Sequence, residues 1–86
     1  MSRPSLTLYN SASCWFCARV RQTIEQLGMD VEIRDAAGDA RHRAELLAGG
    51  GKTQVPCLRI EDAAGQVRWM YESADICRYL EEVAAA

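Results

Sequence analysis

The sequence has no surplus of basic residues and no long apolar run. Ten Lys and Arg residues are set against twelve Asp and Glu residues, which gives a formal net charge of -2. A chain without a basic surface is not expected to bind nucleic acid or a membrane surface, so small molecules or other proteins are the expected partners. No stretch approaches the length of a membrane span, and residues 1–5 lack the apolar core of a signal peptide. We therefore expect a cytoplasmic protein.

Residues for hydrolytic or phosphate chemistry are also scarce. The single histidine, His42, lies among charged residues, which is typical of the exposed face of a helix. No combination of His, Ser and Asp suggests hydrolysis, and no carboxylates have the spacing of metal ligands. Gly51-Lys52-Thr53 is similar to the end of a phosphate-binding loop, but Leu46 stands where that loop needs a glycine. The predicted order of elements is also wrong for such a loop.

Cysteine, in contrast, is well represented, with four residues in a chain of 86. In a reducing compartment cysteines stay reduced unless they are catalytic or bound to metal, so these four indicate chemistry more than scaffolding. The decisive pair is Cys14 and Cys17, in the motif C-W-F-C between a short apolar run at 6–9 and an amphipathic segment at 18–27. A strand, C-x-x-C and helix in this order are typical of a redox motif.

Cys14 is the candidate nucleophile of this pair. The first turn of a helix supplies free backbone N–H groups and the positive end of the helix dipole, both of which stabilise a thiolate. Cys17 lies three residues further on, so both side chains share one helix face and lie within disulfide reach. Half of a zinc site is an alternative, but Cys57 and Cys77 stand alone and offer no second pair of ligands. An inert pair of core thiols is the other alternative.

The length predicts one domain over residues 1–86, and no internal repeat or interdomain linker interrupts it. Hydrophobic periodicity predicts strands at 6–9, 31–35, 57–60 and 67–71. Helices are expected from the first turn of the motif to Gly28, from an Asp39 cap to the glycines at 49–51, and from a Ser73 cap to a frayed end at 84–86. Their predicted apolar faces are Phe16, Val20, Ile24 and Leu27 in the first helix; Ala40, Ala44, Leu47 and Ala48 in the second; and Ile76, Leu80 and Val83 in the last.

This β-α-β-α-β-β-α order predicts an α/β fold. Two strand-helix units imply parallel pairing, and the closing hairpin adds antiparallel strands. We expect a mixed four-stranded sheet with helices on both faces.

Two further stretches have both a structural and a functional interpretation. Pro56, at the start of a predicted strand, is either an ordinary edge proline or a place where the backbone of a ligand can approach. Ser73 is either a plain helix cap or, with free N–H groups at the helix start, a site for a carboxylate.

Three motifs together resemble a glutaredoxin, in the stand-alone form that is similar to the N-terminal domain of glutathione transferases. They are C-W-F-C at 14–17, K-T-Q-V-P at 52–56 and Y-E-S-A-D-I-C-R-Y-L at 71–80, and with their order and spacing they span nearly the whole chain. The resemblance implies a thioredoxin-like fold, a cis bond before Pro56 and glutathione lying across the motif. It implies that the Val55 backbone pairs with the cysteinyl part of glutathione, that Glu72 and Ser73 hold the γ-glutamyl end, and that Cys14 meets the sulfur. The implied glutathione-binding residues are Trp15, Gln54, Val55, Pro56, Glu72 and Ser73, and no metal ligand is implied.

The chain departs from the family pattern at two positions beside the nucleophile. Trp15 stands where the family usually has proline, and Ser11 stands where a basic residue is common in glutaredoxins. The loss of that proline changes the preset first turn, which bears on the pKa of the thiolate and its redox potential. Arg19 and Lys52 are the candidate replacements for the missing positive charge.

The leading hypothesis is a monomeric, glutathione-dependent thiol–disulfide oxidoreductase, with Cys14 and Cys17 as catalytic residues and glutathione as co-substrate. Its expected partners are glutathionylated or disulfide-bonded proteins. One alternative is a carrier of a [2Fe-2S] cluster ligated by Cys14 and glutathione, which the missing proline favours and the bulk of Trp15 disfavours. Another is a non-catalytic glutathione-binding module. Cys57 and Cys77 are interpreted as structural.

Overall fold

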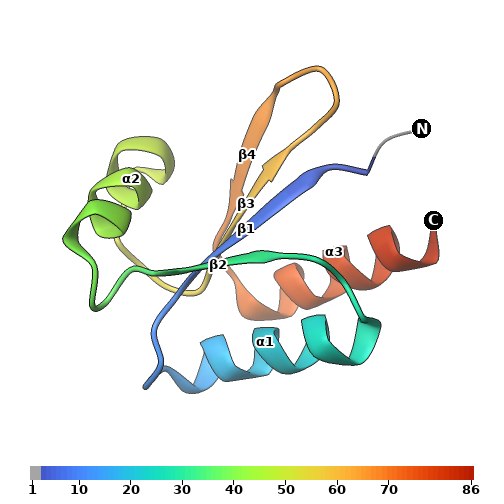
Figure 1. Ribbon diagram of the computed structural model, residues 1–86, viewed down its shortest axis with the longest axis horizontal. Coiled ribbons are helices and arrows are strands. Elements are labelled where there is room, and N and C mark those ends of the chain that lie inside the picture. The colour runs from blue at the N-terminus through green and yellow to red at the C-terminus, as the bar shows by residue number, and fades with distance from the viewer. Residues whose placement is uncertain (1–2) are drawn as a thin grey trace.

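A four-stranded sheet organises the computed structural model, which describes residues 3–86 (Figure 1). The element order is β-α-β-α-β-β-α, as predicted. The elements are β1 (Ser5–Asn10), α1 (Trp15–Leu27), β2 (Glu32–Asp35), α2 (Ala40–Gly50), β3 (Cys57–Glu61), β4 (Val67–Met70) and α3 (Ser73–Ala85). Among the described residues, no helix is long and apolar enough to cross a membrane.

The sheet is mixed, and the predicted thioredoxin-like α/β fold is confirmed. Its strand order is β2-β1-β3-β4, which places β1 and β3 in the centre. β1 pairs with β2 in parallel and with β3 antiparallel, so that Leu8 lies opposite Ile33 on one side and Leu58 on the other. The β3–β4 hairpin completes the antiparallel part of the sheet.

The two faces of the sheet carry different helices, as expected. α1 and α3 run side by side against one face, and α2 lies on the opposite side (Figure 1). Because side chains alternate along a strand, β1 sends Leu6 and Leu8 to the first face and Tyr9 to the second. The larger cluster joins both central strands to α1 and α3 through Leu6, Leu8, Val20, Ile24, Leu58, Ile60, Ile76, Cys77 and Leu80.

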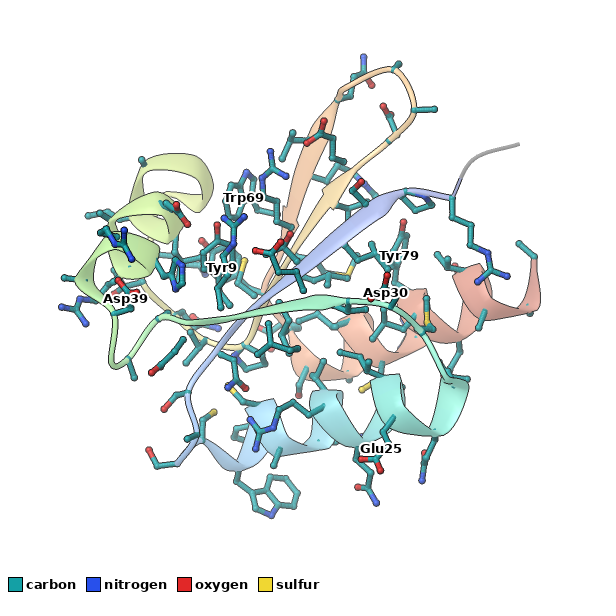
Figure 2. The ribbon with its side chains drawn as sticks, in the orientation of Figure 1. Tyr9, Glu25, Asp30, Asp39, Trp69 and Tyr79 are labelled. Atoms are coloured by element: carbon teal, nitrogen blue, oxygen red, sulfur yellow. The ribbon has the colours of Figure 1, made fainter. Side chains whose placement is uncertain are left out.

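Beneath α2, a smaller cluster is centred on Tyr9, which is 1% exposed. The Tyr9 ring packs against Trp69 with centroids 5.6 Å apart, and Figure 2 shows the two side by side. Its hydroxyl donates to Glu45 Oε1 at 3.2 Å and accepts from Arg34 Nη1 at 3.0 Å. These hydrogen bonds link β1, β2 and α2. They also satisfy the buried Tyr9 hydroxyl, which would destabilise the fold if it had no hydrogen-bond partner.

Most helix ends follow the predicted signals. Gly28 ends α1 with a positive φ of 63°, a conformation that glycine adopts without steric cost. Asp39 caps α2 by accepting the N–H of Arg41 at 2.9 Å. The start of α3 was predicted wrongly, since Glu72 and not Ser73 is the N-cap residue and no side chain caps that end. The predicted fraying from residue 84 is also wrong, because α3 continues to Ala85.

Two of the predicted apolar faces need correction. Phe16 is 53% exposed, and in the first turn of α1 it is Cys17 that is buried. In α2 only Leu46 is buried, whereas Leu47 is 52% exposed and the alanines at 40, 44 and 48 are also exposed. Periodicity cannot choose between two adjacent leucines in a helix with few large apolar residues. Leu46 is the buried leucine because it packs in the cluster with Tyr9 and Cys57.

Candidate functional site

The candidate nucleophile lies where the central strand β1 leads into α1. Cys14 is the N-cap residue of α1, with the extended backbone (φ -85°, ψ 120°) that N-caps adopt. Its Sγ accepts the backbone N–H of Cys17 at 3.3 Å. The Cys14 N–H donates in turn to the Ser11 carbonyl at 3.2 Å, which fixes the turn that precedes the helix. The sulfur therefore faces the free N–H groups at the positive end of the helix.

This position makes Cys14 a better thiolate than an ordinary cysteine. Burial acts to raise the pKa of Cys14, but hydrogen bonds from the Cys17 thiol and from the N–H groups of Cys17 and Phe16 act against it, as does the charge of Arg21. The sum of these effects holds the pKa of Cys14 below its usual value. A thiol with a lowered pKa is more ionised at neutral pH, and it is also a better leaving group.

Arg21 is the functional residue that the sequence analysis missed. Its Nη1 donates to the Asn10 side-chain oxygen and to the Ser11 carbonyl, the latter at 3.4 Å, so the guanidinium lies against the loop that leads to Cys14. The two basic residues considered instead, Arg19 and Lys52, are both exposed. Helical spacing could have identified Arg21, because it follows Cys14 by seven residues and so lies on the same face of α1.

The second cysteine of the motif has the opposite properties. Cys17 is fully buried, and burial, with the hydrogen bond that its thiol donates to Cys14, raises the pKa of Cys17 to about 11. At neutral pH Cys17 is therefore a protonated donor beside an ionisable acceptor. The two environments therefore shift the two pKa values in opposite directions, which makes Cys14 the better candidate nucleophile and Cys17 a candidate donor to it.

Beside the start of α1, two distant segments of the chain form a groove of about 150 Å³. One segment precedes β3 and contains the cis peptide bond between Val55 and Pro56 that the resemblance implies. The other segment leads from β4 into α3. The groove is lined by Phe16, Gln54, Val55, Pro56, Tyr71, Glu72 and Ser73. The structure thus brings together five of the six residues predicted to bind glutathione.

The sixth predicted residue, Trp15, does not line this groove. Its side chain is 72% exposed and packs edge to face on Phe16, with ring centroids 5.3 Å apart. Its contact with glutathione stays a prediction. Phe16 and Tyr71 line the groove although the sequence analysis did not select them. A larger hollow of about 650 Å³ lies near the first residues of β1, at the opposite end of the strand from Cys14, and is not part of this site.

The remaining cysteines lie in the two cores. Cys57 is fully buried in the cluster beneath α2, and burial raises the pKa of Cys57 to about 11. Cys77 is 9% exposed and accepts a hydrogen bond from the Thr23 hydroxyl at 3.3 Å. All four cysteines are free thiols. Within residues 3–86, no group of three or more His, Cys, Asp or Glu side chains could hold a metal ion.

Comparison with known proteins assigns the chain to a family. Residues 8–86 match the model of the glutathione S-transferase N-terminal domain. The chain belongs to this family. The chain is also similar in sequence to a glutaredoxin of Pseudomonas aeruginosa, with 34% identity over 57 residues, which are 66% of this chain and 68% of the relative. The predicted resemblance is therefore confirmed.

Two solved structures of longer proteins are similar to this chain. Maleylacetoacetate isomerase from Anaeromyxobacter dehalogenans, solved with bound dicarboxyethyl glutathione and citrate, has a TM-score of 0.73 and 26% identity. The alignment covers 99% of this chain but 39% of the isomerase. A trimeric glutathione transferase of Leishmania has a TM-score of 0.73 and 27% identity, over 91% of this chain and 17% of the transferase. The chain thus corresponds to less than half of each of these proteins.

Proposed function

We propose that the protein is a glutathione-dependent thiol–disulfide oxidoreductase with Cys14 as its nucleophile. The observation that carries this proposal is the Cys14 sulfur at the N-cap of α1, which accepts the Cys17 N–H at 3.3 Å and has a lowered pKa. A passive binding module does not need an activated sulfur at this position. A C-x-x-C pair with one activated and one protected thiol is suited to disulfide exchange.

Glutathione is the proposed co-substrate, and the groove is its proposed site. The family match and the isomerase solved with glutathione in its active site support this assignment. In the proposed pose, the backbone of Val55 pairs with the cysteinyl part of glutathione. Glu72 and Ser73, at the N-terminus of α3, hold the γ-glutamyl end, where free N–H groups favour a carboxylate. Both segments border Phe16, which places the groove beside the helix turn that carries Cys14.

The proposed reaction has two exchange steps. In the first, the Cys14 thiolate attacks the glutathione sulfur of a glutathionylated substrate, which forms a Cys14–glutathione disulfide and releases the substrate as a thiolate. In the second, the thiolate of a second glutathione molecule attacks the glutathione sulfur of this mixed disulfide, which releases oxidised glutathione and restores Cys14. The net reaction consumes one free glutathione, which joins the glutathionyl group of the substrate as oxidised glutathione and leaves the substrate as a free thiol. The lowered pKa of Cys14 helps it to attack in the first step and to leave in the second.

In this scheme the main role of Cys17 is to donate a hydrogen bond to the Cys14 sulfur, and not to act as a nucleophile. With a pKa of about 11, it is almost wholly protonated at neutral pH. Attack by Cys17 on the mixed disulfide, which would close an internal disulfide, is therefore slow at pH 7, because burial also disfavours the Cys17 thiolate in that intermediate. We propose that residues 1–86 act as one monomeric domain in the cytoplasm, on glutathionylated or disulfide-bonded proteins.

Glutathione-coupled reduction of a small mixed disulfide tests the proposal. The wild type is compared with Cys14→Ser and Cys17→Ser, and Cys77→Ser serves as a control that changes a thiol outside the site. We expect Cys14→Ser to abolish turnover and Cys17→Ser to keep most of it. Turnover that survives Cys14→Ser, or a wild type with none, would overturn the proposal.

A further inference from the structure

Tyr71 occupies a central place in the groove. It directly follows β4 and directly precedes Glu72 and Ser73, and its half-buried ring lines the groove between that segment and Val55. The backbone of Tyr71 thus continues into Glu72 and Ser73 on the α3 side of the groove, while its side chain contacts the segment on the opposite side, which carries Val55.

These side-chain contacts reach both ends of the segment that runs from Lys52 to Cys57. The Tyr71 hydroxyl donates to the Lys52 carbonyl at 3.0 Å. The Lys52 ammonium lies over the ring, 4.5 Å from its centroid. At the other end, Tyr71 packs against the cluster that contains the buried Cys57. One side chain therefore contacts the first residue of the stretch carrying Val55 and Pro56 and the cluster in which that stretch ends.

Gly50, the last residue of α2, packs against the Tyr71 side chain. A Cβ added to Gly50 would lie 1.9 Å from the Tyr71 hydroxyl oxygen and 2.9 Å from Cζ, so the hydroxyl packs directly against the glycine backbone. No larger residue fits there while the hydroxyl keeps its place. The neighbouring Gly49 has the same relation to a different ring, because its added Cβ would lie 2.0 Å from Trp69 Cζ2.

We infer that Tyr71 is a positioning residue that holds the Lys52–Cys57 segment at the correct distance from Glu72 and Ser73. By its hydrogen bond to Lys52 it fixes the backbone of Val55, and by its place in the chain it relates that backbone to the start of α3. This inference rests on the proposed function, because it assigns to Tyr71 the geometry of the proposed glutathione site. A preorganised groove binds more tightly than one that must be ordered on binding.

The test compares Tyr71→Phe with Tyr79→Phe. The first substitution keeps the ring and removes only the hydroxyl that reaches Lys52. The second is a matched control, because Tyr79 is also half-buried and also lies beneath a cation, with Arg68 Cζ 5.4 Å from its ring centroid. Tyr79 lies in α3 (Figure 2) and does not line the groove. We expect Tyr71→Phe to raise the KM for glutathione about three- to tenfold, the effect of one lost hydrogen bond, with kcat unchanged within about twofold. Tyr79→Phe should change neither.

Gly50→Ala, paired with Gly49→Ala, separates positioning from loss of stability. Both alanines overpack against an aromatic ring, but only Gly50→Ala displaces Tyr71. We expect Gly50→Ala to raise the KM for glutathione as Tyr71→Phe does, and Gly49→Ala to leave it near the wild-type value.

Titration calorimetry with S-methylglutathione, which cannot exchange disulfides, measures the same effect without turnover. A dissociation constant that is equal in the wild type and Tyr71→Phe would overturn the inference. If the wild type binds S-methylglutathione but has no turnover, the proposed oxidoreductase function fails, and the inference is still decided by comparing Tyr71→Phe with Tyr79→Phe. If the wild type does not bind, both proposals are overturned.

Discussion

Replacing Cys17 with alanine removes the thiol that donates to the Cys14 sulfur and leaves the backbone N–H at 3.3 Å in place. Hydrogen bonds to charged groups contribute about 1.5–3 kcal/mol, and because a thiol is a weak donor we take about 1 kcal/mol for this one. Loss of that stabilisation raises the pKa of Cys14. At a pH below the pKa of Cys14 in both proteins, this rise reduces the fraction of Cys14 thiolate about fivefold.

The rate of alkylation changes by less than the thiolate fraction. A thiolate of higher pKa is intrinsically more nucleophilic, which offsets the fivefold loss by about twofold and leaves Cys14 of the variant about 2.5-fold slower at low pH. At a pH where Cys14 is fully ionised in both proteins, only nucleophilicity differs, so the variant is about twofold faster. The two pH profiles must therefore cross.

The assay is alkylation of Cys14 by iodoacetamide across a pH series, followed by mass spectrometry of the Cys14 peptide. Cys17→Ser is the matched control, because its hydroxyl can still donate to the Cys14 sulfur, and its profile should lie nearer to the wild type. Profiles of the wild type and Cys17→Ala that superimpose would refute a role for the Cys17 thiol. A variant that is faster at every pH would refute the sign of the effect.

Two other predictions test the packing of α2 and the role of the buried thiol. Leu46→Ala should lower the free energy of unfolding by about 2–5 kcal/mol, because Leu46 is fully buried, while Leu47→Ala should change it by less than about 0.5 kcal/mol. Urea unfolding measures both, and equal losses would contradict the packing of α2. Closure of the Cys14–Cys17 disulfide from the Cys14–glutathione intermediate should accelerate steeply with pH between about pH 7 and 9, because burial, which the intermediate keeps, raises the pKa of Cys17 above its usual value and its thiolate fraction rises with pH. Stopped-flow measurement of glutathione release checks this, and a rate independent of pH would contradict it.

The elements that carry strong local signals were predictable from the sequence. Gly28 ends α1 and Asp39 caps α2, because each signal acts within one turn of the chain. The position of Cys14 at a helix start is of the same kind. Where the outcome depends on contacts between distant residues, the sequence was not sufficient. The choice of Leu46 over Leu47 is made by Tyr9 and Cys57, which lie in other elements.

The same distinction holds within the candidate site. The residues of each motif were found by local pattern, but Tyr71 acquires its place from Gly50 and Lys52, which are far from it in sequence. Arg21 was missed for a different reason, since its spacing of seven residues from Cys14 was visible in the sequence but was not used, and its contact with Asn10 in the structure shows its place. Motifs indicate which residues react, and tertiary packing determines which residues hold them in place.

The central position of β1 has a consequence for the protein while it is being made. β1 and α1 come from the first third of the chain, whereas β3, which covers the other edge of β1, and every residue that lines the groove except Phe16 come from residues 54–73. Since the N-terminal part of a chain leaves the ribosome first, Cys14 and Cys17 emerge before the groove exists. A nascent chain therefore carries both thiols before the groove that we propose for glutathione is complete. The proposed site is assembled only after residues 71–73 have been synthesised.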